Sequence, residues 1–155
     1  ASATFLNRSR SNLGLVASLE QCFIFDVDGT LALHAARNPY QWRDADDDLP
    51  NRPVVVALRA LNQAGYKILY VSGRPEEARE LTLSWLGREV GVLGPLFLRP
   101  DGDNRKDFEI KSEIYRREIE PKFDVVAVFD DRDQVIRMWR DQAKLTCFQV
   151  ADGNF

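Results

Sequence analysis

The sequence has few of the residues that carry zinc or nucleophilic chemistry in many enzymes. It contains one histidine, His34, which excludes a zinc site built from several histidines and gives a Ser/His/Asp triad no support. Its two cysteines, Cys22 and Cys147, lie far apart, form no CxxC pair and each sits among strand-like apolar neighbours. We therefore expect two buried free thiols, as is typical of a reducing cytoplasm, and chemistry that depends on carboxylates.

Long apolar runs and an excess of positive charge are also missing. No uninterrupted apolar stretch is longer than the five residues of 125–129, far short of the roughly 20 residues that a membrane helix needs, and no such run opens the chain as a signal peptide would. With 21 Lys and Arg against 24 Asp and Glu, the net charge is -3, too acidic for coating duplex DNA through phosphate contacts alone. We expect a soluble cytoplasmic protein with no membrane partner, whose contact with any nucleic acid is local.

The length and composition fit one globular domain. The chain has 155 residues, 45% of them hydrophobic and 29% charged, which excludes a collagen-like or wholly disordered chain. Residues 1–18 are small, polar and weakly basic, which indicates a tail or linker. We therefore place the folded domain at 19–155.

Short apolar runs alternate with helical patterns along this domain. The strand-like runs are 22–25, 68–71, 94–98, 125–129 and 145–150. Helical spacing follows Pro53 up to Gly65, follows Pro75, covers about 107–118 and begins again near Asp133. Three of the strands are continuously apolar, as in a buried parallel sheet. The alternation predicts an α/β fold with a Rossmann-like parallel sheet of about five strands between helices.

The segment 31–52 departs from this alternation. It is rich in Arg, Asp, Pro and aromatic residues and is predicted to be a loop-like insertion directly after the first strand, where a small lid would sit. Within it, Tyr40 and Trp42 could stack on a nucleobase or form the small core of the lid. Trp85 and Trp139, by contrast, fall on helix faces and are predicted to be core residues.

Two carboxylates and a glycine follow the first strand, in the sequence Asp-Val-Asp-Gly-Thr at 26–30. In an open α/β sheet, ligands bind outside the carboxyl ends of the strands, so Asp26 and Asp28 stand where a site is expected. An ionised aspartate is a competent nucleophile, and Gly29 lets the backbone bend so that its amides approach an anion. An ordinary acidic turn uses the same residue types, so this motif alone leaves both interpretations open.

Two further strands also end in polar residues. The second is followed by Ser72, Gly73 and Arg74 at the start of a helix, whose N-terminus favours anions. The fourth ends in Asp130 and Asp131, which repel each other unless a cation lies between them, and oxygen ligands without nearby His or Cys favour Mg²⁺. A serine turn and a helix-capping aspartate are the simpler interpretations.

Asp107 and Lys111 lie four residues apart on a predicted helix, so both project from one face. There the lysine could neutralise a phosphoryl group while the aspartate orients it, although a solvated ion pair is the simpler interpretation. The joint occurrence of acids, a serine, a lysine and paired acids in this order favours a phosphoryl-transfer site over four unrelated turns.

The combination resembles the haloacid-dehalogenase-type phosphohydrolases, whose four motifs match 26–30, Ser72, Lys111 and Asp130-Asp131 in the same order. A closer similarity, over 22–155, is to the phosphatase domain of the phage polynucleotide 5′-kinase/3′-phosphatase family. The segments that carry it are DVDGTLA at 26–32, Arg37-Asn38-Pro39-Tyr40, VSGR at 71–74, GDNRKD at 102–107, FDDR at 129–132, MWR at 138–140 and CFQV at 147–150.

The resemblance implies a Mg²⁺-dependent polynucleotide 3′-phosphatase that acts on DNA or RNA ends during repair, with 2′,3′-cyclic phosphate as a further candidate substrate. Asp26 would form an aspartyl phosphate, and Asp28 would protonate the leaving oxygen and later activate water. Asp26, the Asp28 main chain, Asp130 and Asp131 would hold the metal.

The resemblance also implies a set of residues around the phosphate. Ser72 and Lys111 would hold its nonbridging oxygens and stabilise the transition state. The remaining positions required by the family's motifs, or placed against the substrate by them, are Arg37, Arg74, Asp107, Gly29, Thr30 and Gly73.

The chain contains no GxxxxGK[ST] sequence, so the kinase half of the bifunctional phage enzymes is absent from it. The chain is therefore either a lone phosphatase or an excised domain of a kinase-phosphatase. Beside the nucleic-acid 3′ ends, a fused or associated 5′-kinase or ligase is a candidate partner. A small-molecule phosphatase such as a nucleotidase is the main alternative, because the four motifs specify phosphoryl transfer and not the leaving group. A noncatalytic module that binds phosphorylated ends is the third, against which the presence of both Asp26 and Asp28 argues.

Overall fold

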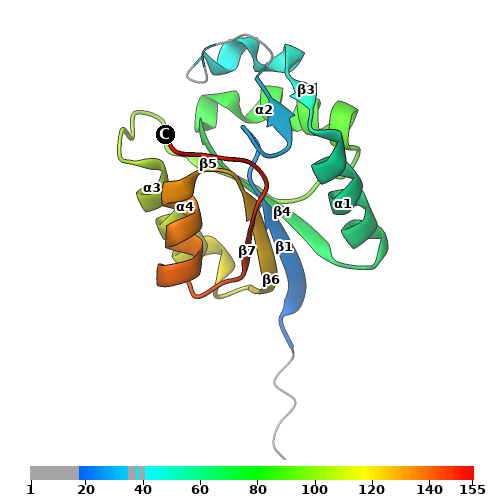
Figure 1. Ribbon diagram of the computed structural model, residues 1–155, viewed down its shortest axis with the longest axis vertical. Coiled ribbons are helices and arrows are strands. Elements are labelled where there is room, and N and C mark those ends of the chain that lie inside the picture. The colour runs from blue at the N-terminus through cyan, green and yellow to red at the C-terminus, as the bar shows by residue number, and fades with distance from the viewer. Residues whose placement is uncertain (1–17, 35–37, 39–40) are drawn as a thin grey trace, which may run out of the picture.

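A five-stranded parallel sheet lies at the centre of the molecule, in the strand order β5-β4-β1-β6-β7 (Figure 1). The computed structural model describes residues 18–34, 38 and 41–155. The strands of this sheet are β1 Glu20–Phe25, β4 Lys67–Pro75, β5 Leu96–Arg99, β6 Phe123–Asp130 and β7 Cys147–Gln149. Each overlaps one of the five predicted apolar runs, and the predicted α/β fold is confirmed.

Among the described residues, four α-helices cover the two faces of the sheet (Figure 1). They are α1 Arg52–Gln63, α2 Arg79–Trp85, α3 Asp107–Ile114 and α4 Asp133–Arg137. The last three continue into the π-helical turns η3 Leu86–Val90, η4 Tyr115–Ile119 and η5 Met138–Gln142, and the 3₁₀ turn η2 Glu76–Ala78 precedes α2. Pro53 occupies the first turn of α1, and Gly65, with φ +98°, follows its end, as the sequence signals predict.

The side chains of β1 alternate between two buried clusters, one on each face of the sheet. Phe23 and Phe25 pack with residues of α1 and with Trp85 and Leu86. Cys22 and Ile24 point to the other face and pack with residues of η4, α4 and η5, together with Cys147 of β7. Both cysteines are buried free thiols, as expected, and burial raises the pKa of each to about 12. Within the part of the chain that the structure describes, no helix is long and apolar enough to span a membrane.

The insertion after β1 is more ordered than the loop we predict from its composition. Its described residues include an antiparallel pair of short strands, β2 Ala32–Leu33 and β3 Leu49–Pro50, and the 3₁₀ helix η1 Trp42–Asp47. Strands of two residues are too short to produce an alternating pattern, so the sequence gives no sign of them. The insertion lies at the end of the sheet where the strands have their carboxyl ends (Figure 1), which is the place expected for a lid.

Candidate active site

Three carboxylates gather where β1 and β6 end side by side. Asp26 follows β1, Asp130 closes β6 and Asp131 comes next; one oxygen from each lies within 4.8 Å of the others. The Asp26 amide donates to the Phe129 carbonyl at 3.0 Å, which continues the pairing of the two strands up to the site. Since neighbouring parallel strands bring their carboxyl ends to one edge, acids that are about a hundred residues apart in sequence meet here.

Lys111 neutralises part of this charge. Its side chain is 1% exposed, and Nζ lies 2.9 Å from Asp26 Oδ1, 3.0 Å from Asp130 Oδ2 and 3.5 Å from Asp107 Oδ2. Burial alone lowers the pKa of Lys111, but the charges of Asp107, Asp130 and Asp26 outweigh it and hold this pKa well above its ordinary value. The lysine therefore carries its positive charge at neutral pH. The predicted alternative of a solvated ion pair is wrong.

One ammonium group does not balance the acids around it. Burial, followed by the charge of Asp130, raises the pKa of Asp26 well above its ordinary value, although Lys111 acts in the opposite direction. Burial and Asp130 also raise the pKa of Asp131. The fully ionised cluster is thus unfavourable without another cation, and its ligands are all oxygen atoms, the donor set that suits a hard divalent ion. The residues present fit such a metal.

Gly29 and Thr30 shape the backbone beside these acids. Gly29 has φ +80°, and a Cβ atom at this position would lie 2.2 Å from Asp131 Oδ2, so only glycine fits. The Thr30 hydroxyl lies 3.2 Å from Asp26 Oδ2 and 3.3 Å from Asp131 Oδ1. The structure therefore brings both residues to the carboxylates.

Arg74 holds Asp28 from the neighbouring strand. Its Nε and Nη2 donate to the two oxygens of Asp28 at 2.8 and 2.6 Å, a bidentate pair that fixes both groups. Behind it, Nη1 donates to Thr82 Oγ1 at 3.0 Å, and Nη2 lies 3.5 Å from Asp48 Oδ2. The Arg74 side chain is only 2% exposed, so these contacts satisfy a buried guanidinium.

Asp48 and Thr82 are missing from the residues predicted for the site. Asp48 is one of several acids in the insertion, and nothing in the sequence marks it as the buried one. Thr82 is buried within α2, and only the tertiary fold brings its hydroxyl to Arg74. Trp85 and Trp139 are core residues as predicted, but each indole N–H also reaches the site: Trp85 donates to the Asp48 carbonyl at 2.9 Å and Trp139 to Asp130 Oδ2 at 3.2 Å.

Ser72, Gly73 and Asp107 complete the predicted set. The buried Ser72 hydroxyl accepts from the Arg74 amide at 3.2 Å. A Cβ atom on Gly73 would lie 2.4 Å from Asp107 Oδ1, so this glycine allows Asp107 to approach the strand. Asp107 also lies 3.6 Å from Arg99 Nη2.

These residues border a pocket of about 1010 Å³. Its described lining includes Asp26, Asp28, Gly29, Gly73, Arg74, Asp107 and Asp131 from the predicted site. Thr30, Ser72, Lys111 and Asp130 are buried and contact them. The insertion contributes Leu33, His34 and Trp42 to the lining, and the C-terminal segment contributes Asp152 and Phe155. Arg37 and Tyr40 lie outside the described residues.

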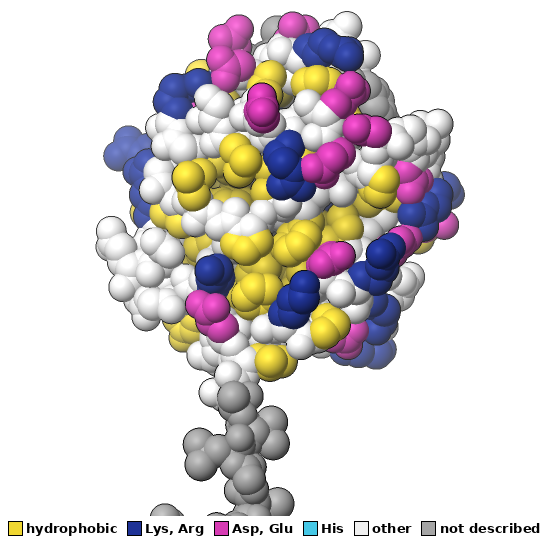
Figure 2. Space-filling model, turned by 180° about the vertical axis from the view of Figure 1, so that it is seen from behind, with side chains coloured by type: hydrophobic (Ala, Val, Ile, Leu, Met, Phe, Trp, Pro, Cys, Tyr) yellow, Lys and Arg dark blue, Asp and Glu magenta, His cyan; other side chains and the backbone are white. Residues whose placement is uncertain are grey.

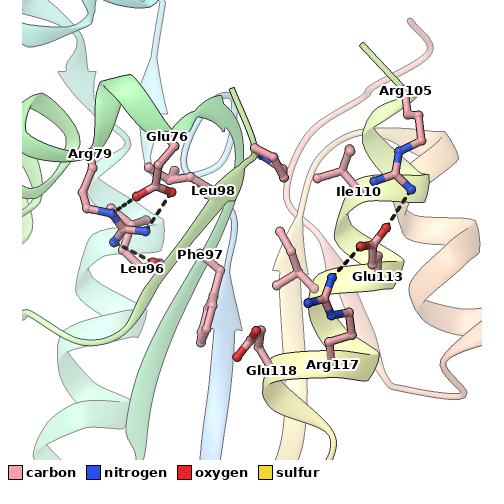
Figure 3. Close-up of a pocket in the computed structure, with 12 residues that line it drawn as sticks. Glu76, Arg79, Leu96, Phe97, Leu98, Arg105, Ile110, Glu113, Arg117 and Glu118 are labelled. Atoms are coloured by element: carbon pink, nitrogen blue, oxygen red, sulfur yellow. Dashed lines mark hydrogen bonds and ion pairs between the residues drawn. The ribbon is translucent and has the colours of Figure 1, made fainter. Parts of the chain in front are cut away.

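A second pocket lies away from the carboxylates, between β5 and α3 (Figure 3). Its volume is about 390 Å³. Glu113 binds Arg105 at 2.7 Å and Arg117 at 3.0 Å, and Arg79 pairs with Glu76. From behind, Figure 2 shows hydrophobic side chains gathered in the middle of the molecule with charged side chains around them. None of the predicted site residues that the structure describes lines this second pocket.

Comparison with known proteins identifies the family. Residues 20–155 match the family described as the polynucleotide kinase PNKP phosphatase domain. A candidate bifunctional polynucleotide kinase/RNA ligase of Autographa californica nuclear polyhedrosis virus is 34% identical over 128 residues, which are 81% of this chain and 18% of the viral protein.

Solved structures show the same relationship. A chain of the Pnkp1/Rnl/Hen1 RNA repair complex superposes with a TM-score of 0.87 at 40% identity, over 97% of this chain and 48% of that one. A second structure of the Pnkp1/Rnl/Hen1 complex gives 0.85 and 42%, over 88% and 47%. A class C acid phosphatase from Bacillus anthracis, at 0.57 and 18% over 83% and 64%, shares the fold alone. The chain spans about half the length of the Pnkp1/Rnl/Hen1 relatives. It belongs to the family of PNKP phosphatase domains, which are haloacid-dehalogenase-type phosphomonoester hydrolases.

Proposed function

We propose that this chain removes the 3′-phosphate from RNA or DNA ends in a Mg²⁺-dependent reaction, as part of nucleic-acid end repair. The observation that carries the proposal is the placement of Asp26 against Lys111, Asp130 and Asp131, beside an Asp28 that Arg74 holds. The family match supports phosphomonoester hydrolysis, and the relatives named for polynucleotide kinase and RNA repair support a polynucleotide substrate. An associated or fused kinase or ligase belongs to the same proposal.

In the proposed reaction, Asp26 attacks phosphorus as a carboxylate. A bond forms between a carboxylate oxygen and phosphorus while the bond from phosphorus to the 3′ oxygen breaks, and Asp28 gives that oxygen its proton. Asp28 then takes a proton from a water whose oxygen bonds to phosphorus while the bond from Asp26 to phosphorus breaks, which releases inorganic phosphate and restores the Asp26 carboxylate. In the structure both oxygens of Asp28 accept from Arg74, so Asp28 must release at least one of these bonds when it transfers the proton.

The other residues act on the charge of the phosphate. Lys111 and the hydroxyl of Ser72 are proposed to bind nonbridging oxygens, which gain charge as the bond to the leaving group breaks. The Gly29 and Thr30 amides already donate to the Ala32 and Val27 carbonyls, at 2.9 and 3.2 Å, so these two residues are proposed to shape the loop beside the phosphate. The pocket around the phosphate is also lined by the Gly73 backbone, Asp107 and Arg74. Arg37 is proposed to reach the phosphate from the insertion. Mg²⁺, held by Asp26, Asp130, Asp131 and the Asp28 main chain, would offset the repulsion between these acids and the substrate.

Magnesium is expected to stabilise the protein in a pH-dependent manner. Addition of Mg²⁺ at about a hundredfold excess over its Kd should raise the Tm of EDTA-treated protein by roughly 5–10 °C at pH 8. The rise should be smaller at pH 5, because the pKa values of Asp26 and Asp131 are raised and protons then compete with the metal. Thermal unfolding in KCl of matched ionic strength is the control. Equal shifts at the two pH values would contradict this expectation.

The test of function is phosphate release from matched oligonucleotides. RNA and DNA strands with a 3′-phosphate or a 5′-phosphate are incubated with Mg²⁺ or with EDTA, beside a mononucleoside 3′-phosphate. The proposal requires release from 3′ ends alone, and only with Mg²⁺. Equal or faster hydrolysis of the mononucleotide would favour the small-molecule phosphatase, and binding without any release would favour the noncatalytic module. The same assay with a 2′,3′-cyclic phosphate end tests the further candidate substrate.

A further inference from the structure

We propose that the ring of Phe155 is a stacking surface for a nucleobase at the 3′ end whose phosphate binds at Asp26. This inference rests on the proposed function, because it names the part of the site that recognises the polynucleotide beyond its phosphate. Phe155 lines the same pocket as Asp26. It follows β7 on a segment that returns to the carboxyl end of the sheet, where the insertion also lies (Figure 1).

The C-terminal segment is fixed to the turn that carries the acids. The Val150 amide donates to the Asp130 carbonyl at 3.0 Å, and the Asp133 amide donates to the Gly153 carbonyl at 3.0 Å. A Cβ atom on Gly153 would lie 2.0 Å from the Asp131 carbonyl oxygen, so the two backbones are in direct contact. These backbone contacts therefore fix the position of Phe155 relative to Asp130 and Asp131.

Arg132, which lines the same pocket, contacts the Phe155 ring and leaves most of the residue exposed. The guanidinium of Arg132 lies over the ring, 5.2 Å from its centroid, and Arg132 Nε donates to the Phe155 carbonyl at 2.8 Å. Despite this contact the residue is 64% exposed. An aromatic ring that is held in place on a pocket wall and is largely exposed can accept a planar ligand without first being ordered.

The size of the pocket and the chemistry of bases both suit this role. A volume of about 1010 Å³ is far larger than a phosphate needs and is at the upper end of the range for sites that enclose whole organic ligands. Every base presents a π face, so stacking on an aromatic side chain tolerates any sequence. That property fits an enzyme that acts on strand ends of varied sequence.

The test compares Phe155→Ala and Phe155→Trp with a matched control. Phe148→Ala removes the same ring from β7, where Phe148 is 50% exposed, packs on the ring of Phe129 at 5.0 Å and lies outside the described lining of the pocket. The substrates are a 3′-phosphorylated oligonucleotide, the same strand with an abasic site at the last or the second-last position, and glycerol phosphate, which has no base.

Phe155→Ala should raise KM for the oligonucleotide about tenfold, within the range of about 5- to 150-fold that alanine substitution at stacking residues produces. Phe155→Trp should keep the wild-type KM, and glycerol phosphate hydrolysis should not change. An abasic site at the stacked position should raise the wild-type KM by a similar factor and should have no further effect in Phe155→Ala, which also identifies the stacked base.

The inference would be overturned by an unchanged oligonucleotide KM in Phe155→Ala, or by an equal rise in KM for glycerol phosphate in that variant. An equal rise in the oligonucleotide KM of Phe148→Ala would also overturn it, since the effect would then not be specific to the pocket. If the wild-type protein released no phosphate from 3′ ends, the proposed function would fail as well. Failure of the inference alone would leave wild-type release intact.

Discussion

Replacing Asp26 with asparagine is expected to abolish phosphate release while the protein stays folded. An amide oxygen is a poor nucleophile, and removal of a nucleophile lowers kcat by about 10³-fold or more in enzymes of this kind. The measurement is single-turnover phosphate release from a 3′-phosphorylated oligonucleotide with saturating Mg²⁺. Residual turnover near the wild-type rate would eliminate Asp26 as the nucleophile.

The stability of this variant separates a chemical role from a structural one. The pKa of Asp26 is raised in the folded protein above its ordinary value of 3.8, so its ionised form costs folding free energy, and this cost appears as the pH rises through the raised pKa. Asparagine removes that charge and can still accept the hydrogen bond from Lys111. In EDTA at pH 8 we therefore expect Asp26→Asn to unfold at or above the wild-type Tm.

Asp124 provides the matched control. It is exposed at the start of β6, at the opposite end of the sheet from the site, where it accepts from Gln21 Nε2 at 3.4 Å. Asp124→Asn makes the same chemical change without touching the pocket and should leave both turnover and Tm unchanged. A large drop in Tm for Asp26→Asn, with none for Asp124→Asn, would show that the carboxylate is needed for folding.

The sequence was most informative where a motif is local. The pairing of Asp107 with Lys111 follows from helical spacing alone, and the structure places Nζ of Lys111 within 3.5 Å of Asp107 Oδ2. The convergence of Asp26 and Asp130 follows from a parallel sheet whose strands end together, once the strands are identified by their apolar runs. In both cases a regular geometry converts sequence position into spatial position.

The sequence was uninformative where tertiary packing decides. Asp48 and Thr82 become partners of Arg74 only because η1 of the insertion and α2 pack against each other beside it, and no periodicity encodes that arrangement. The composition of the insertion indicates a loop and gives no sign of its strands. These strands have two residues each, so they carry no strand pattern and are stabilised by pairing with each other, not by β-propensity. The same limit applies to Trp139, whose ring fits the apolar face of its helix while its N–H binds Asp130.

Replacing Lys111 with methionine is expected to have the largest effect on stability. Methionine fills a similar volume, but the change leaves Asp26 and Asp130 buried without their ammonium partner. Removing one member of a buried ion pair costs about 3–5 kcal/mol. Turnover should also fall by about 10²-fold or more, since the cation that offsets transition-state charge is gone. Lys122→Met is the control, because Lys122 is an exposed lysine that pairs with Glu118 at 3.4 Å.

The pH dependence of this loss identifies its cause. Without Lys111, the carboxyl group of Asp26 should have a still higher pKa in the folded protein, so its neutral form is favoured and the penalty fades as the pH falls. The difference in unfolding free energy between wild type and Lys111→Met, measured by urea titration in EDTA, should therefore be larger at pH 8 than at pH 5. A difference that does not vary with pH would indicate lost packing instead of an uncompensated charge. The double variant Asp26→Asn/Lys111→Met should be more stable than Lys111→Met alone at pH 8, because it removes one of the charges that the lysine neutralises.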